Sequence, residues 1–222
     1  MPRKLKNTKP LIYVFCEGES EQAYTDFLKK EFADVALIKR PGTTGIFEVA
    51  AAKFSKDAKY RDSAEVTDEI WFFFDVEQTD ISKWDSRYKI MKSLRKLRKD
   101  PNIRIRLLMT TACIEYWFML HYQYYVPNLA TVADKARVMA DLLKKEPLYP
   151  KGDSISTERI ASHYPTAVGN GEKTVRNQLA QGMPCMEDTD DRNKWLYTCC
   201  NTFSNVYEAI QFLEELKNKL PD

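Results

Sequence analysis

The stretch that decides the fold of this chain is IWFFFDVE, from Ile70 to Glu77. Its first five residues are apolar and mostly aromatic, which is typical of a buried β-strand. The strand is expected to end directly at Asp75. An acidic side chain is therefore expected at the edge of the sheet where this strand ends. A strand without a polar face is usually part of a parallel sheet that helices cover on both sides.

Three further apolar runs predict the other strands of this sheet, and segments of helix length separate them. The predicted strands are Leu11–Cys16, Val35–Ile38 and Ile103–Met109, and the helices between the strands are expected at about Ser20–Phe32, Ile46–Phe54 and Trp84–Lys99. Strands that alternate with helices favour a parallel sheet with right-handed crossovers. The sequence therefore predicts an α/β fold.

Beyond Ala112 the pattern is helical. Helices are predicted at Ile114–Tyr125, Val132–Leu143 and Phe203–Leu216, with a loop and one short helix between Lys145 and Asn170. We expect a basic tail at residues 1–10, an α/β core at 11–125 and a helical extension at 126–222. The extension is expected to pack on the core, so that the chain forms one unit.

Composition limits the class of protein. Of the 222 residues 44% are hydrophobic and 30% are charged, as in soluble globular proteins. No apolar run is long enough to cross a membrane or to act as a signal peptide, so we expect a cytoplasmic protein without a membrane partner. The five cysteines show no pairing or zinc pattern, and reduced thiols are expected. A net charge of +2 does not by itself indicate a polyanionic partner.

Acidic residues follow two of the predicted strands. Glu17 comes directly after the first strand, and Asp75 and Glu77 come after the third. Ligands of parallel sheets bind outside the carboxyl ends of the strands, and residues two apart in an extended segment face the same way. Carboxylates that converge without Cys or His are the ligands that Mg²⁺ or Mn²⁺ prefers. The alternative is that these acids are solvated loop residues.

Three motifs resemble those of the RloB-like family. VFCEGESE at residues 14–21, with Tyr24, resembles the family's CEGE-x-[TS]E-x-x-Y opening, and FDVE at 74–77 lies where the family has a D-V-D element. ACIEYWFMLHY at 112–122 resembles its NPCFE-x-W-L-L-L-H-F helix, and Tyr149–Lys151 is similar to a Y-x-K element. The motifs occur in the family's order, from about residue 11 to residue 151.

This resemblance implies a Toprim-like fold, related to the catalytic domains of primases, topoisomerases and OLD-type nucleases. It implies that Glu17 is a general acid/base or a metal ligand and that Asp75 and Glu77 hold Mg²⁺. Glu77 departs from the family pattern, which has Asp there, so its carboxylate lies one methylene further out. RloB-like proteins are typically encoded beside an AAA-type ATPase in phage-defence or restriction loci, which implies such a partner.

Three residues are secondary candidates for the site. Glu21 matches a motif position, but an acid also suits the first turn of a helix. Glu115 is expected on a strongly apolar helix, where an unpaired carboxylate is costly, so it either pairs with a basic residue or reaches the metal site. His121 is either a core histidine or a general base.

Charged stretches elsewhere suggest further roles. A basic stripe of four residues could follow the phosphate backbone of DNA or RNA, although it could also be a solvated helix face. The stripe consists of Lys92, Arg95, Lys96 and Lys99. Gly169–Thr174 resembles a phosphate-binding loop, but no strand precedes it. Glu187–Asp191 lacks the glycine and the final glutamate of an EF-hand, and it is expected to be a solvated loop.

The leading hypothesis is a Mg²⁺-dependent nuclease subunit of an antiphage defence system, with Glu17, Asp75 and Glu77 as catalytic residues. The alternative is a non-catalytic Toprim-like module that senses or recruits for an AAA-type ATPase. Nucleotidyl transfer of the primase type would use the same acids, and the sequence does not separate it from hydrolysis.

Overall fold

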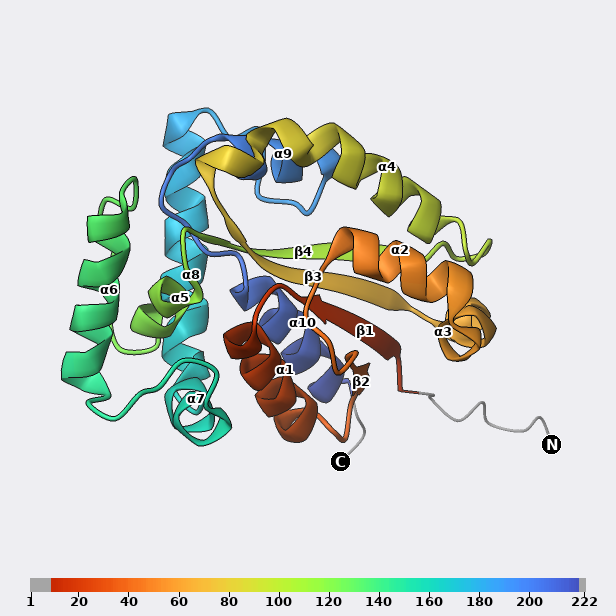
Figure 1. Cartoon of the computed structure of the whole chain (residues 1–222), viewed down its shortest axis with the longest axis horizontal. Coiled ribbons are helices and arrows are strands. Elements are labelled where there is room, and N and C mark those ends of the chain that lie inside the picture. Colours follow the sequence, from red (N-terminus) through yellow and green to blue (C-terminus); the bar gives the residue numbers. More distant parts are fainter. Residues whose placement is uncertain (1–8, 220–222) are drawn as a thin grey trace.

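A four-stranded parallel sheet forms the centre of the molecule, and the computed structural model describes residues 9–219 (Figure 1). The strands are β1 (Leu11–Cys16), β2 (Leu37–Lys39), β3 (Glu69–Val76) and β4 (Arg104–Thr111), in the order β2-β1-β3-β4. All three neighbouring pairs are parallel. The predicted α/β class is confirmed. Most of the predicted basic tail lies outside the described residues.

The strand order reverses direction at β1. After β1 the chain turns to β2 on one side, whereas β3 lies on the other side of β1. A parallel sheet has a crevice at such a switch point, outside the carboxyl ends of the two central strands. The predicted acids follow these two strands, β1 and β3.

Helices cover both faces of the sheet (Figure 1). One face carries α1 and α10, and the other carries α2, α4 and α9. The bounds are α1 (Glu19–Glu31), α2 (Phe47–Lys56), α3 (Ala58–Ser63), α4 (Trp84–Arg95), α9 (Asp190–Thr198) and α10 (Tyr207–Lys217). The predicted helix at Trp84–Lys99 is thus four residues too long, and α9 was not predicted.

Alternate residues of β3 hold the two layers together. Phe72 stacks on Phe47 of α2 with ring centroids 4.2 Å apart, whereas Phe73 packs edge-on against Tyr24 of α1 at 6.0 Å. Trp71 points to the same side as Phe73 and meets Phe212 of α10. Successive side chains of a strand point to opposite faces, so an uninterrupted apolar run is needed when both faces are covered.

A second group of helices lies beyond the carboxyl ends of the strands. It consists of α5 (Ile114–Leu120), α6 (Val132–Lys145), α7 (Ser154–Ala161) and α8 (Tyr164–Arg176), and short 3-10 segments lie at Ala64–Val66, Gln78–Lys83 and Asn177–Gln181. The predicted helix at Ile114–Tyr125 ends early, at Leu120. The short helix predicted between Lys145 and Asn170 is present as α7. The loop predicted for the rest of this stretch is wrong after Tyr164, where α8 begins.

The glycines of α8 explain that error. Gly171 lies inside the helix, and a Cβ atom there would stand 3.0 Å from Trp117 and 3.1 Å from Tyr207. The glycine therefore allows α8 to approach α5 and α10 closely, instead of marking a turn. Gly169–Thr174 is accordingly helical and does not form a phosphate-binding loop.

The C-terminal part of the chain returns to the sheet and covers the open edge of β4. Ser204 forms an antiparallel bridge with Thr110. Asn205 accepts a hydrogen bond from the backbone N–H of Met109 (2.6 Å) and donates one to the carbonyl of Leu107 (2.9 Å). These contacts satisfy edge groups that would otherwise be free to pair with another chain.

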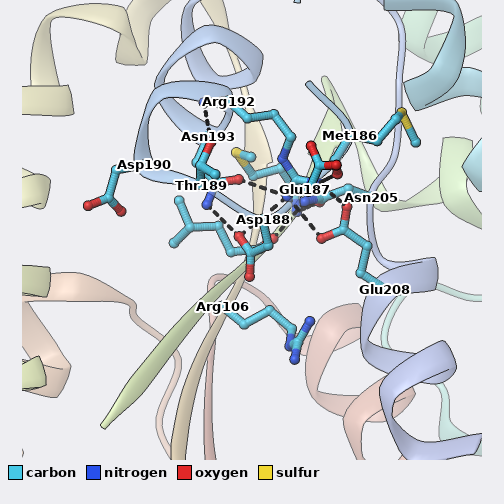
Figure 2. A network of polar contacts seen from close by, with 12 residues as sticks. Arg106, Met186, Glu187, Asp188, Thr189, Asp190, Arg192, Asn193, Asn205 and Glu208 are labelled. Atoms are coloured by element: carbon cyan, nitrogen blue, oxygen red, sulfur yellow. Dashed lines mark hydrogen bonds and ion pairs between the residues drawn. The ribbon is translucent and has the colours of Figure 1, made fainter. Parts of the chain in front are cut away.

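A buried arginine, Arg192, connects segments of this C-terminal part through hydrogen bonds and ion pairs (Figure 2). Arg192 is 1% exposed, and its guanidinium donates to both carboxylate oxygens of Glu208, at 2.6 and 3.0 Å. It also donates to the carbonyl of Met186 (2.7 Å) and pairs with Asp188 (3.4 Å). The segment before α9 is thereby tied to α10.

The prediction of a solvated loop at Glu187–Asp191 holds only in part, because Glu187 and Asp191 are exposed whereas Asp188 and Asp190 form ion pairs. Asp188 pairs with Arg192 and with Arg104 of β4, and Asp190 accepts two hydrogen bonds from Arg95 of α4. The acids of this stretch connect α9 to two elements of the core.

No helix in residues 9–219 combines the length and the apolar character that a membrane-spanning helix requires.

Replacement of the buried arginine tests the importance of this network. Arg192→Met leaves the buried carboxylate of Glu208 without its cation, and we expect the free energy of unfolding to fall by roughly 3–5 kcal/mol. Urea denaturation measures this change. The double variant Arg192→Met/Glu208→Met should recover much of the loss, because it removes both charges.

Arg176→Met is the matched control, since Arg176 is largely exposed and pairs with Glu172 at the surface. This substitution should cost less than about 1 kcal/mol. Equal losses in Arg192→Met and Arg176→Met would contradict the structural role of the buried network.

Candidate functional site

Glu17 and Asp75 meet at the switch point of the sheet. Glu17 directly follows β1 and Asp75 is the second-last residue of the neighbouring strand β3. The Oε2 atom of Glu17 accepts a hydrogen bond of 2.9 Å from the backbone N–H of Asp75. The backbone N–H of Glu17 in turn donates to the carbonyl of Phe73 (3.0 Å). The first and third strands are neighbours in the sheet, so the two acids lie at one edge.

A hollow of about 350 Å³ opens at this edge, and we call it the acidic hollow. Its polar lining includes Glu17, Glu19, Ser20, Glu21, Asp75 and Lys151. Glu21 lies in the first turn of α1 and is only 4% exposed, whereas Glu17 and Glu19 are exposed. Helix α1 therefore places the buried carboxylate of Glu21 beside Asp75 in the lining of the acidic hollow.

Burial and mutual repulsion disfavour the ionised forms of these acids. The pKa of Asp75 is raised well above its ordinary value, first by desolvation and then by the charges of Glu21, Glu17 and Glu115. Desolvation also raises the pKa of Glu21, to about 7, against hydrogen bonds from the backbone. The pKa of Glu17 is raised by desolvation, although the hydrogen bond from Asp75 opposes this. The cluster therefore favours a bound proton or a cation.

Glu115 adds a fourth carboxylate, and Lys151 supplies the cation beside it. Glu115 lies in the first turn of α5 and is 2% exposed, and its Oε1 atom stands 3.2 Å from the Nζ atom of Lys151. The contact is an ion pair, and Oε1 has no hydrogen-bond partner among the described residues. Desolvation lowers the pKa of Lys151, but the Glu115 carboxylate outweighs it and the pKa is raised. The expected basic partner of Glu115 is thus found, and it borders the acidic hollow.

A short loop positions Lys151. The hydroxyl of Tyr149 lies 3.3 Å from the hydroxyl of Ser20, which also accepts a hydrogen bond of 3.1 Å from the backbone N–H of Gly152. Gly152 has φ +75°, and a Cβ atom there would stand 2.9 Å from the side chain of Glu19. The glycine thus permits the loop to dock on the first turn of α1.

Glu77 lies apart from this cluster. Its carboxylate forms an ion pair with Lys135 of α6, and it borders a different hollow. The argument from two-residue spacing applies only within a strand, and β3 ends at Val76, after which the chain bends into the 3-10 segment Gln78–Lys83. The structure brings together Glu17, Glu21, Asp75 and Glu115, whereas Glu77 pairs with Lys135 and acts on this cluster only through its charge, which contributes to the raised pKa of Glu17.

His121 lies in the core. It is 2% exposed, its Nδ1 atom is 3.0 Å from the carbonyl of Trp117, and its Nε2 atom is 3.0 Å from the hydroxyl of Tyr24. Burial lowers its pKa to about 3, so the ring is neutral. A neutral ring donates from Nδ1 to the carbonyl and accepts at Nε2. His121 does not border the acidic hollow.

The predicted basic stripe does not form one helical face. Helix α4 ends at Arg95, so that Lys96 caps it and Lys99 lies beyond it. The guanidinium of Arg95 is engaged by both carboxylate oxygens of Asp190, at 2.7 and 2.5 Å. The Nζ atom of Lys92 lies 4.7 Å from the ring centroid of Tyr88.

Arg87 is a residue of the site region that the sequence interpretation missed. It is 7% exposed and donates to the carboxylate of Asp80 (3.3 Å) and to the hydroxyl of Tyr197. Its charge lowers the pKa of Glu17 and so opposes desolvation there. The signal was present, because Arg87 interrupts the apolar face that Trp84 and Met91 mark on α4.

The donor set can be compared with the needs of a divalent cation. Among residues 9–219 no group of three or more Asp, Glu, His or Cys side chains is close enough, as arranged, to hold a metal ion. The donors are nevertheless hard oxygens, and Oδ1 of Asp75 and Oε1 of Glu115 are buried without hydrogen-bond partners. The chemistry of these residues fits Mg²⁺ or Mn²⁺, which prefer oxygen ligands.

The raised pKa of Glu21 predicts how stability depends on pH in metal-free buffer. Between its ordinary value of 4.5 and about 7, folded Glu21 keeps a proton that the unfolded chain has lost, so stability falls as pH rises. Glu21→Gln should flatten this profile and raise the free energy of unfolding at about pH 8 by up to roughly 3 kcal/mol. Urea denaturation in EDTA at several pH values measures the profile.

Glu19→Gln is the matched control, because Glu19 is an exposed acid in the same turn. Its profile should follow that of the wild type. A wild-type stability that rises from about pH 5 to about pH 8 would contradict the burial of an ionisable Glu21.

Comparison with known proteins gives one match. The family model described as "RloB-like protein" matches residues 12–213, which include the acidic hollow and the helices around it. Neither the curated proteins nor the solved structures contain a match to the chain. The four-stranded parallel sheet and its flanking helices agree with the Toprim-like architecture expected from the resemblance. The chain belongs to the RloB-like protein family.

Proposed function

We propose that this RloB-like protein is a Mg²⁺- or Mn²⁺-dependent nuclease subunit of an antiphage defence system, acting on phosphodiester bonds of DNA or RNA in the cytoplasm. The observation that carries the proposal is the cluster of Glu17, Glu21, Asp75 and Glu115 at the switch point. Acids that are desolvated and repel one another cost stability, so a cation that neutralises them restores it.

The acids would have two separate roles, cation binding and proton transfer. Glu21, Asp75 and Glu115 are buried or half-buried, and they would hold the cation. When bound, the cation neutralises the acids and polarises the scissile phosphate. Glu17 is exposed, and only its Oε2 atom is engaged by the Asp75 backbone, so its other oxygen is available to accept a proton from water. Its raised pKa makes Glu17 a stronger base than an ordinary glutamate.

Lys151 would contact the phosphate. Its side chain is 64% exposed although its ammonium group pairs with Glu115, so one end of the residue is fixed and its charge faces the acidic hollow. A fixed cation stabilises negative charge that develops in a transition state. The loop around Gly152 holds this charge in place through Ser20.

An AAA-type ATPase would be the partner protein. The only stretch resembling a phosphate loop that the sequence interpretation considered, Gly169–Thr174, lies inside α8. The proposal therefore assigns ATP hydrolysis to the partner and phosphodiester chemistry to this chain.

A specific observation also supports the second candidate, a non-catalytic sensing or recruitment module. Lys151 already neutralises Glu115, and the described acids do not stand in a ready-made metal-binding arrangement. In such a module Lys151 would act as the permanent cation of the cluster. Nucleotidyl transfer of the primase type would use the same acids as hydrolysis.

The substitutions Asp75→Asn, Glu21→Gln and Glu17→Gln test the catalytic proposal. Each keeps the size of the side chain and removes its charge, and each should eliminate Mg²⁺- or Mn²⁺-dependent cleavage. Lys151→Ala should slow cleavage by about a hundredfold or more, and Lys151→Arg should restore part of the rate. The assay measures cleavage of single- and double-stranded DNA and RNA with and without the ATPase partner. Glu48→Gln is the control that should cut normally, because Glu48 is an exposed acid in the first turn of α2 and does not border the acidic hollow.

A second readout separates the two candidates. Mn²⁺ should raise the melting temperature of the wild type and not that of Asp75→Asn, since a ligand of the folded state stabilises it. If the wild type with its partner cuts nothing, yet Asp75→Asn abolishes phage protection, the module is correct. If protection survives all three acid substitutions, neither role belongs to this cluster.

A further inference from the structure

A second hollow lies beside the acidic hollow at the same edge of the sheet, and we call it the side hollow. Its volume is about 270 Å³, and its lining includes Val76, Glu77, Thr79, Ala112, Ala130 and Lys135. It thus lies between the carboxyl ends of β3 and β4 and the start of α6.

The two hollows share a wall. Asp75 lines the acidic hollow and the next residue, Val76, lines the side hollow. Likewise, Ile114 lines the acidic hollow and Ala112 lines the side hollow. The backbone N–H of Ala112 donates to the carbonyl of Val76 at 3.0 Å. A polymer bound with one phosphate at the acids would therefore place its neighbouring unit at the side hollow.

The backbone of the side hollow is strained at two points. Ala112 has φ +68°, and the N–H of Cys113 donates to the carbonyl of Thr111 at 2.8 Å, which closes a tight three-residue turn. Cys200, which also lines this hollow, has φ +55°. In residues 9–219 these are the two non-glycine residues with positive φ. Such strain persists where surrounding structure holds it and gathers at functional sites.

The lining suits a nucleoside. Val76, Ala112 and Ala130 offer apolar surface, and the hydroxyl of Thr79 is an uncharged polar group. Ligand sites of this kind combine apolar walls with a few polar groups that fix orientation. The volume is near the lower end for ligand sites and therefore admits one small unit.

Among the described residues that line this hollow, Lys135 is the one cation, and it forms an ion pair with Glu77. The side chains of Lys135 and Glu77 are 33% and 43% exposed. Ion pairs with this exposure are weak, so Lys135 can exchange Glu77 for a phosphate of a bound strand. The pair also gives Glu77 a role outside the acidic hollow.

We infer that the side hollow receives one unpaired nucleoside of a nucleic-acid strand, next to the phosphate that lies at the acidic hollow, while Lys135 contacts a strand phosphate. The inference rests on the proposed function in taking nucleic acid as the substrate, and it names the class as single strands. A base pair does not fit the volume, and a duplex would first have to expel a nucleotide at an energetic cost.

Binding of a fluorescent single-stranded oligonucleotide tests this assignment. The titrations use the Asp75→Asn background, so that no strand is cut during the measurement. Lys135→Gln should weaken binding and reduce the slope of log affinity against log salt by about 0.7, the loss of one phosphate contact. Ala130→Phe should fill the hollow and weaken binding about tenfold, the loss of one nucleoside contact.

Two further variants sharpen the test. Glu77→Gln frees Lys135 from its acid, so single strands should bind more tightly than before. Lys144→Gln is the matched control, because Lys144 lies on the same helix, also pairs with an acid (Asp141) and does not border the side hollow. Equal effects of Lys135→Gln and Lys144→Gln would overturn the assignment.

The cysteines provide a readout that requires neither cleavage nor a variant. Cys200 is exposed and lines the side hollow, whereas Cys185 is partly exposed and does not. A single-stranded oligonucleotide should slow the alkylation of Cys200 and leave that of Cys185 unchanged, as followed by mass spectrometry of the wild type in EDTA. Equal protection of Cys200 by duplex would overturn the inference of an unpaired nucleoside.

The outcomes separate this inference from the proposed function. If the acid variants lose cleavage while the side-hollow variants bind and protect like their controls, the nuclease stands and the side hollow is not a subsite. If single strands protect Cys200 and depend on Lys135, yet nothing is cut, the subsite stands and the nuclease does not.

Discussion

The burial of β3 on both faces is the constraint on which the rest of the structure depends. Phe72 must be covered by one layer of helices and Phe73 by the other, so the chain has to place helices on both sides of the sheet. Parallel strands joined by helical crossovers satisfy this requirement. Since parallel strands all end at the same edge, the acids that follow β1 and β3 are forced together there.

This arrangement creates the electrostatic character of the acidic hollow. Side chains that follow a buried strand are partly removed from water, and Glu21 of the next helix turns toward them. Four carboxylates share one region, and Lys151 supplies the only positive charge that pairs with them directly among the described contacts. The same cluster can therefore serve a cation-dependent reaction or be held permanently by its lysine. The two roles differ in whether a divalent cation joins Lys151.

The helices that follow β4 complete this edge instead of forming an independent appendage. Helix α5 delivers Glu115, the segment before α7 delivers Lys151, and α6 forms one side of the neighbouring hollow. The chain then returns through Asn205 to cover the edge of β4, and Arg192 ties α9 to α10. The core predicted at residues 11–125 thus depends on residues near the C-terminus for its last edge.

The sequence by itself determined the parallel sheet, the helices between its strands, and the placement of Glu17 and Asp75 at one edge of the sheet. These features follow from local periodicity and from the rule that parallel strands share one carboxyl edge. That the two acids are neighbours there was decided by the strand order β2-β1-β3-β4. The sequence did not predict helix α8. A glycine such as Gly171 usually indicates a turn, and only the structure shows that this glycine allows close packing against Trp117. The pairing of Glu77 with Lys135, and of Glu115 with Lys151, was likewise decided only by tertiary structure. Each pair joins residues from separate elements, and the distance between such elements depends on packing that local sequence patterns do not encode.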